Sequence, residues 1–155
     1  NYRIPELCSA VGIAQLRRID EFINRRIAIA RLYNEAVSDC PWLVPQKIPA
    51  DYKHSYWTYA LKIDTSKTKV NWDGFRKAYI DNGGESFYGA WSLSYLEPAL
   101  RNNDMVKKGV SFAAGLCPVA ESLQPNLIQL KTNFQSLEFA KVQSEVLRKT
   151  IEMLD

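Results

Sequence analysis

Apolar residues recur at steps of three and four through residues 1–37, and this pattern constrains the fold more than any other feature of the sequence. Pro5 and Glu6 suit the first turn of a helix, because proline needs no amide partner there and a carboxylate is favoured by the helix dipole. Gly12 lies inside the pattern, and because glycine is unfavourable within a helix, we expect any bend of this helix to lie there. The pattern predicts one long helix, of the kind that runs from one domain or subunit to another. Its apolar positions are Leu7, Val11, Ala14, Ile19, Phe22, Ile23, Ile27, Ala30 and Tyr33.

The same segment begins with Asn1-Tyr2-Arg3 and continues with Ala10-Val11-Gly12-Ile13-Ala14-Gln15-Leu16, Ile19-Asp20-Glu21-Phe22-Ile23 and Arg25-Arg26. These motifs resemble the sugar aminotransferases of the DegT/DnrJ/EryC1/StrS family, densely over residues 1–37 and more loosely beyond. The resemblance implies the type I fold of pyridoxal 5'-phosphate enzymes. In that fold the segment bridges a large cofactor domain and a small C-terminal domain.

The family's cofactor-bearing lysine lies before the Asn-Tyr-Arg motif, so the resemblance implies that this chain is a C-terminal fragment with no catalytic residue of its own. The parent enzyme is then expected to transfer an amino group from glutamate to a nucleotide-linked keto sugar, as a cytoplasmic homodimer. The fragment alone is expected to be inactive. The alternative is a non-enzymatic dimerisation or binding module with the same fold.

Composition is that of an ordinary globular domain, with 46% hydrophobic and 24% charged residues in a chain of 155. The net charge of +3 is too small to indicate nucleic-acid binding without a clustered patch. Acidic residues interleave the five arginines of residues 17–31, and stacking aromatics are lacking there, so a solvated or subunit-facing surface is favoured. No apolar run approaches the roughly 20 residues that span a bilayer.

Three widely spaced cysteines and a single histidine, His54, argue against a zinc site, which needs about four ligands. Cys8, Cys40 and Cys117 are predicted to be buried reduced thiols. His54 has the residue type of a catalytic base, but the resemblance assigns proton transfer to the upstream lysine. A structural role is therefore favoured for His54.

The remaining chain predicts a small α/β domain, with a three-stranded antiparallel sheet covered by helices. We expect two domain segments, a bridging helix at residues 1–37 and the small C-terminal domain at residues 38–155. Residues 38–53 contain three prolines and are predicted to be a loop. The expected strands are residues 54–63, 85–91 and 127–130, and the expected helices are residues 72–81, 95–100, 106–114, 117–122 and 137–154.

Asn1 and Arg3 are the first candidate site residues. By resemblance, Asn1 reaches the cofactor phosphate of the partner subunit; the alternative is a turn residue before the helix. Arg3 suits a phosphate or a substrate carboxylate, and its alternative is a local salt bridge to Glu6. Tyr2 is assigned to packing.

Residues 86–98 (SFYGAWSLSYLEP) stand where many family members carry a loop rich in histidine and proline that lines the sugar site. This departure indicates a distinct subgroup, similar to perosamine synthetases. Tyr88 and Trp91, next to Phe87, are the predicted sugar-binding residues, because aromatic rings pack on sugars and bases as well as in cores. Lys131 is a candidate for a substrate diphosphate, with an ordinary surface lysine as the alternative.

Overall fold

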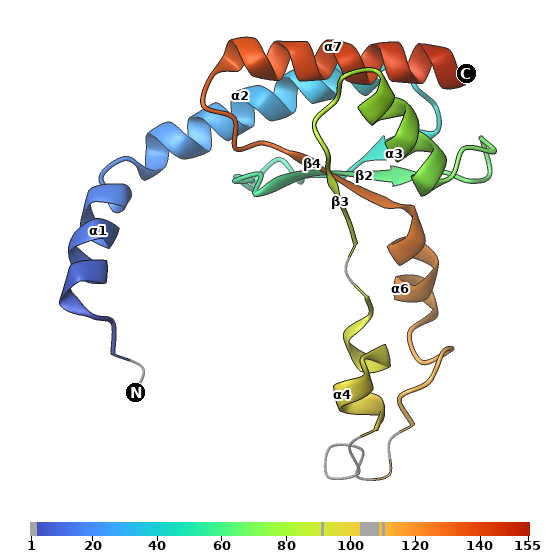
Figure 1. Cartoon of the computed structure of the whole chain (residues 1–155), viewed down its shortest axis with the longest axis horizontal. Coiled ribbons are helices and arrows are strands. Elements are labelled where there is room, and N and C mark those ends of the chain that lie inside the picture. The colour runs from blue at the N-terminus through green and yellow to red at the C-terminus, as the bar shows by residue number, and fades with distance from the viewer. Residues whose placement is uncertain (1–2, 91, 103–108, 110) are drawn as a thin grey trace.

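The structure, a computed structural model, describes residues 3–90, 92–102, 109 and 111–155. The elements in chain order are α1 (Glu6–Leu16), α2 (Ile19–Val37), β1 (Leu43–Pro45), β2 (Thr58–Ile63), α3 (Trp72–Asp81), β3 (Tyr88–Gly89), the 3-10 turn η1 (Ser94–Leu96), α4 (Pro98–Arg101), α6 (Pro118–Leu123), the 3-10 turn η2 (Gln124–Asn126), β4 (Leu127–Lys131) and α7 (Leu137–Leu154). The strands form one antiparallel sheet in the order β1-β2-β4-β3. Helices α2, α3 and α7 cover one face of this sheet, which confirms the predicted α/β class (Figure 1).

The core lies between the sheet and these three helices. Burial alternates along β2 and β4, so that every second side chain points at the helices. The helices contribute one stripe each, which includes Ile29 and Tyr33 of α2, Phe75 of α3 and Leu147 of α7, all at most 1% exposed. The second half of the 1–37 segment therefore belongs to the core of this domain.

The long N-terminal helix is broken, which corrects the prediction of one continuous helix. The break lies at Arg17 and Arg18 and not at Gly12. The amide of Arg18 bonds the carbonyl of Gln15, three residues back, and this tighter turn redirects the chain. The Arg18 side chain then secures the start of α2, since it pairs with Glu21 at 3.1 Å and lies 4.8 Å from the centre of the Phe22 ring.

Strand β2 begins four residues later than predicted, because residues 54–57 form a turn. Tyr56 has a φ of +48°, a left-handed conformation that a strand excludes. Its amide donates to Nδ1 of His54 at 2.9 Å, and the two rings lie 4.3 Å apart. The hydroxyl of Thr132 donates to the Tyr56 carbonyl at 2.5 Å from the other side. His54 therefore holds a turn, in agreement with the structural role favoured for it.

The sheet has four strands where three were predicted, because the proline-rich loop contributes the short strand β1. The strand predicted at residues 85–91 shortens to the two residues of β3, and Trp91 lies outside the described residues. In place of the helix predicted at residues 95–100, the chain forms the 3-10 turn η1 and the short helix α4. Of residues 106–114, only residue 109 and residues 111–114 are described, and these are not helical.

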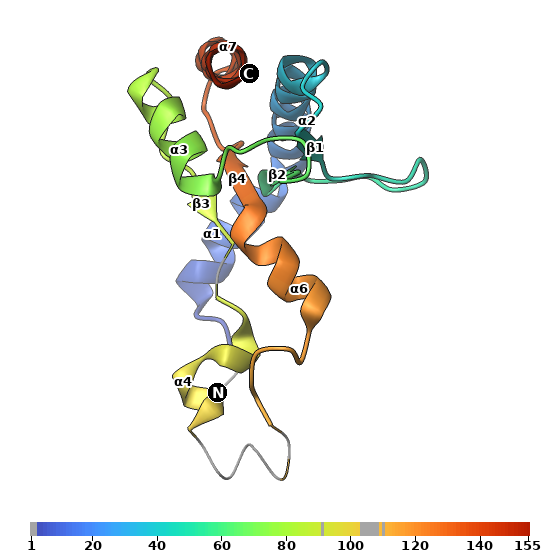
Figure 2. The same cartoon turned by 90° about the vertical axis from the view of Figure 1, so that its right-hand side faces the viewer.

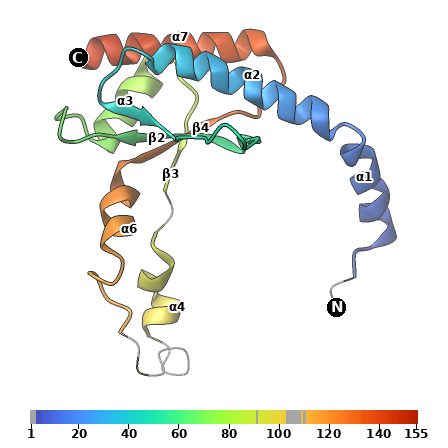
Figure 3. The same ribbon diagram turned by 180° about the vertical axis from the view of Figure 1, so that it is seen from behind.

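Two segments project from the covered sheet on the side away from the helices. One is α1, of which no residue is buried. The other, here called the arm, comprises residues 92–102 and 111–126 and includes α4 and α6. Figure 2 shows the arm below the sheet and the three helices above it. Figure 3 shows α1 on the right and the arm on the left, both extending below the sheet. None of the described helices combines the length and apolar content that crossing a membrane requires.

Candidate functional site

The sheet face turned away from the helices carries the candidate site and is here called the open face. Cross-strand partners share a face, so the residues that alternate with the buried ones point to it. Thr58 lies opposite Lys131, Ala60 opposite Gln129, and Lys62 opposite Leu127. The open face is bordered by α1 and the arm (Figure 1).

Lys131 lies at the end of β4 and is held by an ion pair. Its Nζ is 3.1 Å from a carboxylate oxygen of Glu85, and the Lys131 side chain is 26% exposed. The buried hydroxyl of Tyr33 donates to the Lys131 carbonyl at 3.2 Å. Burial raises the pKa of Tyr33, which keeps this phenol protonated as a donor. Lys131 is thus a fixed, partly neutralised cation rather than a free surface lysine.

Tyr88 lies beside this cation on the edge strand β3, where its Cα pairs with that of Gln129. Its side chain is 51% exposed. The Gln129 amide donates to the carbonyl of Gly89 at 3.4 Å and accepts from the hydroxyl of Thr58 at 3.4 Å. The space beside Gly89 is tight, because a Cβ there would lie 3.0 Å from the Trp72 ring. Trp72 therefore fixes how closely β3 approaches α3.

The edge cluster is the name used below for five residues that the sheet register brings together, Thr58, Glu85, Tyr88, Gln129 and Lys131. It offers a phenol, an amide, a hydroxyl and a paired ammonium, which suit the hydroxyls and phosphates of a polar ligand. It contains no histidine or cysteine for proton transfer or covalent chemistry. The groups of the cluster suit the binding and orientation of a polar ligand.

Sequence reasoning named Tyr88 and Lys131 as candidates, which stay predictions, and did not name Gln129, Glu85 or Thr58 of the same cluster. The register of β2, β4 and β3 joins the strand residues, which lie about forty to seventy positions apart in the sequence, and the ion pair with Lys131 adds Glu85. In the sequence, the alternation of polar residues along β4 was the one indication of this cluster.

Arg3 is not part of the edge cluster. It lies before α1, which projects away from the sheet, and it is exposed. Among the described residues, no ion pair joins Arg3 to Glu6, so the local salt bridge weighed against a ligand role is not formed. Asn1, Tyr2 and Trp91 lie outside the described residues.

The arm leads directly into the edge cluster through β3 and β4, and Glu121 ties its two limbs together. The carboxylate accepts hydrogen bonds from the Tyr95 hydroxyl, from the amide of Gly115 at 2.8 Å and from the amide of Cys117 at 3.2 Å. The Tyr95 hydroxyl and then the Gly115 amide lower the pKa of Glu121. At the base of the arm, Gln124 donates to the carbonyl of Ala90 at 3.2 Å.

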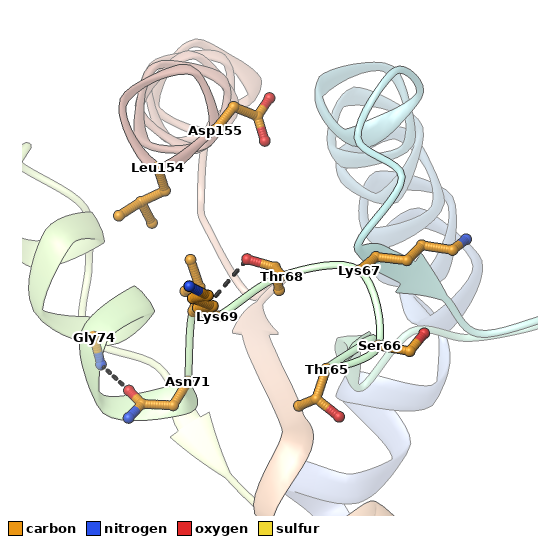
Figure 4. Close-up of a pocket in the computed structure, with 10 residues that line it drawn as sticks. Thr65, Ser66, Lys67, Thr68, Lys69, Asn71, Gly74, Leu154 and Asp155 are labelled. Atoms are coloured by element: carbon orange, nitrogen blue, oxygen red, sulfur yellow. Dashed lines mark hydrogen bonds between the residues drawn. The ribbon is translucent and has the colours of Figure 1, made fainter.

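A broad hollow of about 750 Å³ lies on another part of the molecule, between the loop before α3 and the end of α7. Figure 4 shows its lining, with Asn71 turned to the amide of Gly74 and Thr68 near the chain that follows it. Asn71 accepts from that amide at 2.8 Å, Thr68 accepts from the Val70 amide at 3.1 Å, and Lys67 lies 3.7 Å from Asp64. The side chains of Asn71, Thr68 and Lys67 are thus engaged with the loop itself.

The described residues do not form a complete pyridoxal phosphate site. Such a site needs a lysine in an enclosed pocket together with donors for a phosphate. Lys131 is committed to Glu85, and the edge cluster lies on an open surface. No described group of three or more His, Cys, Asp or Glu residues is arranged to hold a metal ion.

The cysteines correct one prediction. Cys40 is buried as expected, but Cys8 and Cys117 are exposed thiols. On α2, Arg18 and Arg25 both pair with Glu21, at 3.1 and 2.6 Å, and these pairs reduce the local positive potential.

Comparison with known proteins agrees with this architecture. The family model described as the DegT/DnrJ/EryC1/StrS aminotransferase family matches residues 1–146. A protein of Vibrio cholerae named GDP-perosamine synthase is 34% identical over 100 residues, which are 63% of this chain and 27% of that protein. A GDP-perosamine synthase of Escherichia coli O157:H7 is 32% identical over 69 residues, 44% of this chain and 18% of that protein.

Among solved structures, an aminotransferase from Psychrobacter cryohalolentis superposes with a TM-score of 0.81 at 18% identity, over 99% of this chain and 40% of that chain. At this identity the likeness shows the fold. The chain thus spans about a quarter, or less, of the two curated relatives and two fifths of the solved one. The match over residues 1–146 shows that the chain belongs to the DegT/DnrJ/EryC1/StrS aminotransferase family.

Proposed function

We propose that this chain is the C-terminal part of a pyridoxal 5'-phosphate-dependent aminotransferase that transfers an amino group from glutamate to a nucleotide-linked keto sugar. The observation that carries the proposal is the family match over residues 1–146, together with relatives named GDP-perosamine synthase. The edge cluster supports it, since hydrogen-bonding groups beside an exposed aromatic ring are the chemistry that recognises a sugar.

Within the proposed enzyme, the chain supplies binding and assembly. Tyr88 and Trp91 pack on the sugar, and Lys131, steadied by Glu85, approaches the diphosphate. Asn1 reaches the cofactor phosphate of the partner subunit in a cytoplasmic homodimer, with Arg3 beside it. The cofactor, when bound, supplies the electron sink for transamination, and apart from Asn1 the groups that hold it belong to the rest of the proposed parent protein.

A second candidate is a dimerisation or binding module without catalysis, favoured by the exposed apolar residues of α1. One test on the parent protein distinguishes the enzyme from the non-catalytic module. With pyridoxal 5'-phosphate added, the enzyme proposal expects an absorbance band that glutamate bleaches and a GDP-linked keto sugar restores. A parent protein whose spectrum is unchanged by both compounds contradicts the enzyme proposal and favours the module.

Tyr88 gives the test that involves this chain. Tyr88→Ala in the parent enzyme is expected to raise the KM for the keto sugar by about tenfold, with kcat changed by less than about twofold, because a lost stacking surface weakens binding alone. Tyr88→Phe keeps the ring and serves as the matched control. Equal KM values for all three proteins would remove Tyr88 from the sugar site.

A further inference from the structure

A small hollow of about 180 Å³ lies between α2 and the segment that connects β4 to α7. Figure 1 shows this connecting segment passing α2 on its way from the sheet to α7. The hollow is called the arginine hollow below, and its lining comprises Phe22, Arg25, Arg26, Thr132, Asn133 and Phe134. It shares no residue with the edge cluster, so it is a separate candidate site.

Arg26 is a half-buried cation whose hydrogen-bonding capacity is largely unused. A guanidinium carries five N–H donors, but in the described part of the chain only Nη1 has acceptors, the carbonyls of Tyr56 and Trp57 at 3.5 and 3.4 Å. Both carbonyls already accept the hydroxyl of Thr132, at 2.5 and 3.1 Å. No carboxylate pairs with Arg26 within residues 3–90, 92–102 and 111–155. Because a cation withdrawn from water without a counter-charge is unfavourable, this position suits an external anion.

Positive charge exceeds negative charge around the hollow. Arg25 lines it beside Arg26, and its side chain is 31% exposed. The Nη2 of Arg25 lies 2.6 Å from a carboxylate oxygen of Glu21, and the same carboxylate pairs with Arg18 at 3.1 Å. One carboxylate therefore serves two guanidiniums, and Arg26 adds a third. Glu21 itself is not part of the lining, so the groups that face the hollow are cationic, aromatic or neutral.

Two aromatic rings form walls of the hollow, Phe22 from α2 and Phe134 from the connecting segment. Each ring has a neighbour that holds it: Arg18 lies 4.8 Å from the centre of the Phe22 ring, and the ring of Phe139 meets that of Phe134 edge-on at 5.1 Å between centres. Asn133 adds an exposed amide with two donors. Guanidiniums and amides bind phosphates and carboxylates, and aromatic rings pack on flat apolar groups.

We propose that the arginine hollow binds an oxyanion, a phosphate or a carboxylate, that is carried on an aromatic or other flat apolar group. Arg25 and Arg26 hold the oxyanion, and the side-chain amide of Asn133 donates to it. The rings of Phe22 and Phe134 pack on the apolar group. The site goes beyond the proposed function and does not depend on it, because it uses no residue of the edge cluster.

Ligand-observed saturation-transfer NMR with phenyl phosphate tests the proposal on the 155-residue chain at low salt. A Kd of about 1 mM is the scale expected for a probe of this size. Inorganic phosphate is expected to compete about tenfold more weakly, because it lacks the ring. Benzoate carries the same ring on a carboxylate, and the tighter of the two ring probes identifies the preferred oxyanion.

Asn133→Asp is expected to weaken the binding of phenyl phosphate by about tenfold or more, because it places a negative charge in the hollow. Asn133 is exposed, so this change leaves the fold and the contacts of Arg26 in place. Arg26→Gln is expected to cause a similar loss. Arg31→Gln is the matched control, since it removes the same charge from an exposed position of α2 outside the hollow. Its Kd is expected to change by less than about twofold.

Absence of saturable binding up to about 10 mM overturns the proposal. An equal loss in Arg31→Gln also overturns it, because net charge alone then attracts the probe. The titration is repeated on the parent protein saturated with pyridoxal 5'-phosphate, with and without Asn133→Asp. Weaker binding by the variant supports the site in the whole protein. Identical binding by the two overturns it, because another segment of the parent then fills the hollow.

Discussion

Gln143 of α7 is 2% exposed, and its side-chain oxygen accepts two hydrogen bonds. One comes from the hydroxyl of Tyr79 at 3.0 Å and the other from the amide of Glu85 at 2.7 Å. The second bond fixes the backbone of the residue whose carboxylate holds Lys131. A single buried amide thus connects the core to the edge cluster.

Gln143→Leu is expected to lower the free energy of unfolding by about 1–3 kcal/mol, because the Glu85 amide and the Tyr79 hydroxyl both lose their acceptor. Tyr79→Phe removes one bond of the pair and is expected to cost about 1 kcal/mol. Urea unfolding followed by circular dichroism measures both. Gln135→Leu, at an exposed position, is the control, with an expected change below about 0.5 kcal/mol. A Gln143→Leu protein as stable as this control would contradict the assignment.

The roles of single residues were predictable from the sequence where they depend on neighbours along the chain. Asn71 caps α3 by accepting from the Gly74 amide, as its position before the helix predicted. Tyr56 was not predictable, because its left-handed conformation depends on His54 and on Thr132, which lies 76 residues away. Gln129 and Glu85 were missed for the same reason: their roles arise from pairing between distant strands.

At the scale of elements, the arm depends on the charge of one carboxylate. The pKa of Glu121 is lowered from an ordinary value of 4.5, first by the Tyr95 hydroxyl. A group whose pKa is lowered by folding stabilises the folded state above its unfolded pKa and loses this contribution as the pH falls through the folded value. The arm is therefore expected to be held at neutral pH and to loosen on acidification, as the pH falls below the ordinary carboxylate value of 4.5 and through the lowered pKa of folded Glu121.

Hydrogen exchange measured by mass spectrometry tests this expectation on peptides that contain Gly115 and Cys117. Protection should fall on acidification, after correction for the intrinsic rate, while peptides from α7 keep theirs. Glu121→Gln is expected to lose the same protection already at pH 7, because the neutral amide is a weaker acceptor and carries its own donors. Arm protection that stays constant from pH 7 to below pH 4 would show that Glu121 does not hold the limbs together.

Elements with strong periodicity were predicted well, and short elements were not. Helices α3 and α7 appear at their predicted bounds, and β4 extends the predicted strand by one residue. The strand β1 was hidden among prolines, since it has three residues and exists only by pairing with β2. The break between α1 and α2 has no glycine or proline to mark it. The break comes from the tight turn at Arg18. The Arg18 side chain stabilises this turn through its contacts with residues of α2.

At the scale of the whole molecule, α1 is a helix whose apolar residues are all accessible to solvent. We expect the 155-residue chain to self-associate at tens of micromolar through this helix. Leu7→Glu with Val11→Glu is expected to shift sedimentation to the monomer, since carboxylates oppose burial of the same surface.

The control is Val142→Glu, which places the same charge on α7 and is expected to leave the association unchanged. A wild-type chain that sediments as a strict monomer would contradict this expectation. Self-association that survives both α1 substitutions would place the contact elsewhere. The division of the chain into a bridging segment at residues 1–37 and a small domain at residues 38–155 stays a prediction.

The brevity of the outer strands has a consequence for how copies of the chain meet. β1 ends at Pro45, which has no amide to donate, and β3 offers a neighbour only two residues. Neither border of the sheet provides the row of unpaired backbone groups on which another strand is templated. Fibril-like stacking from the sheet margins is therefore disfavoured, and assembly is left to contacts between side chains.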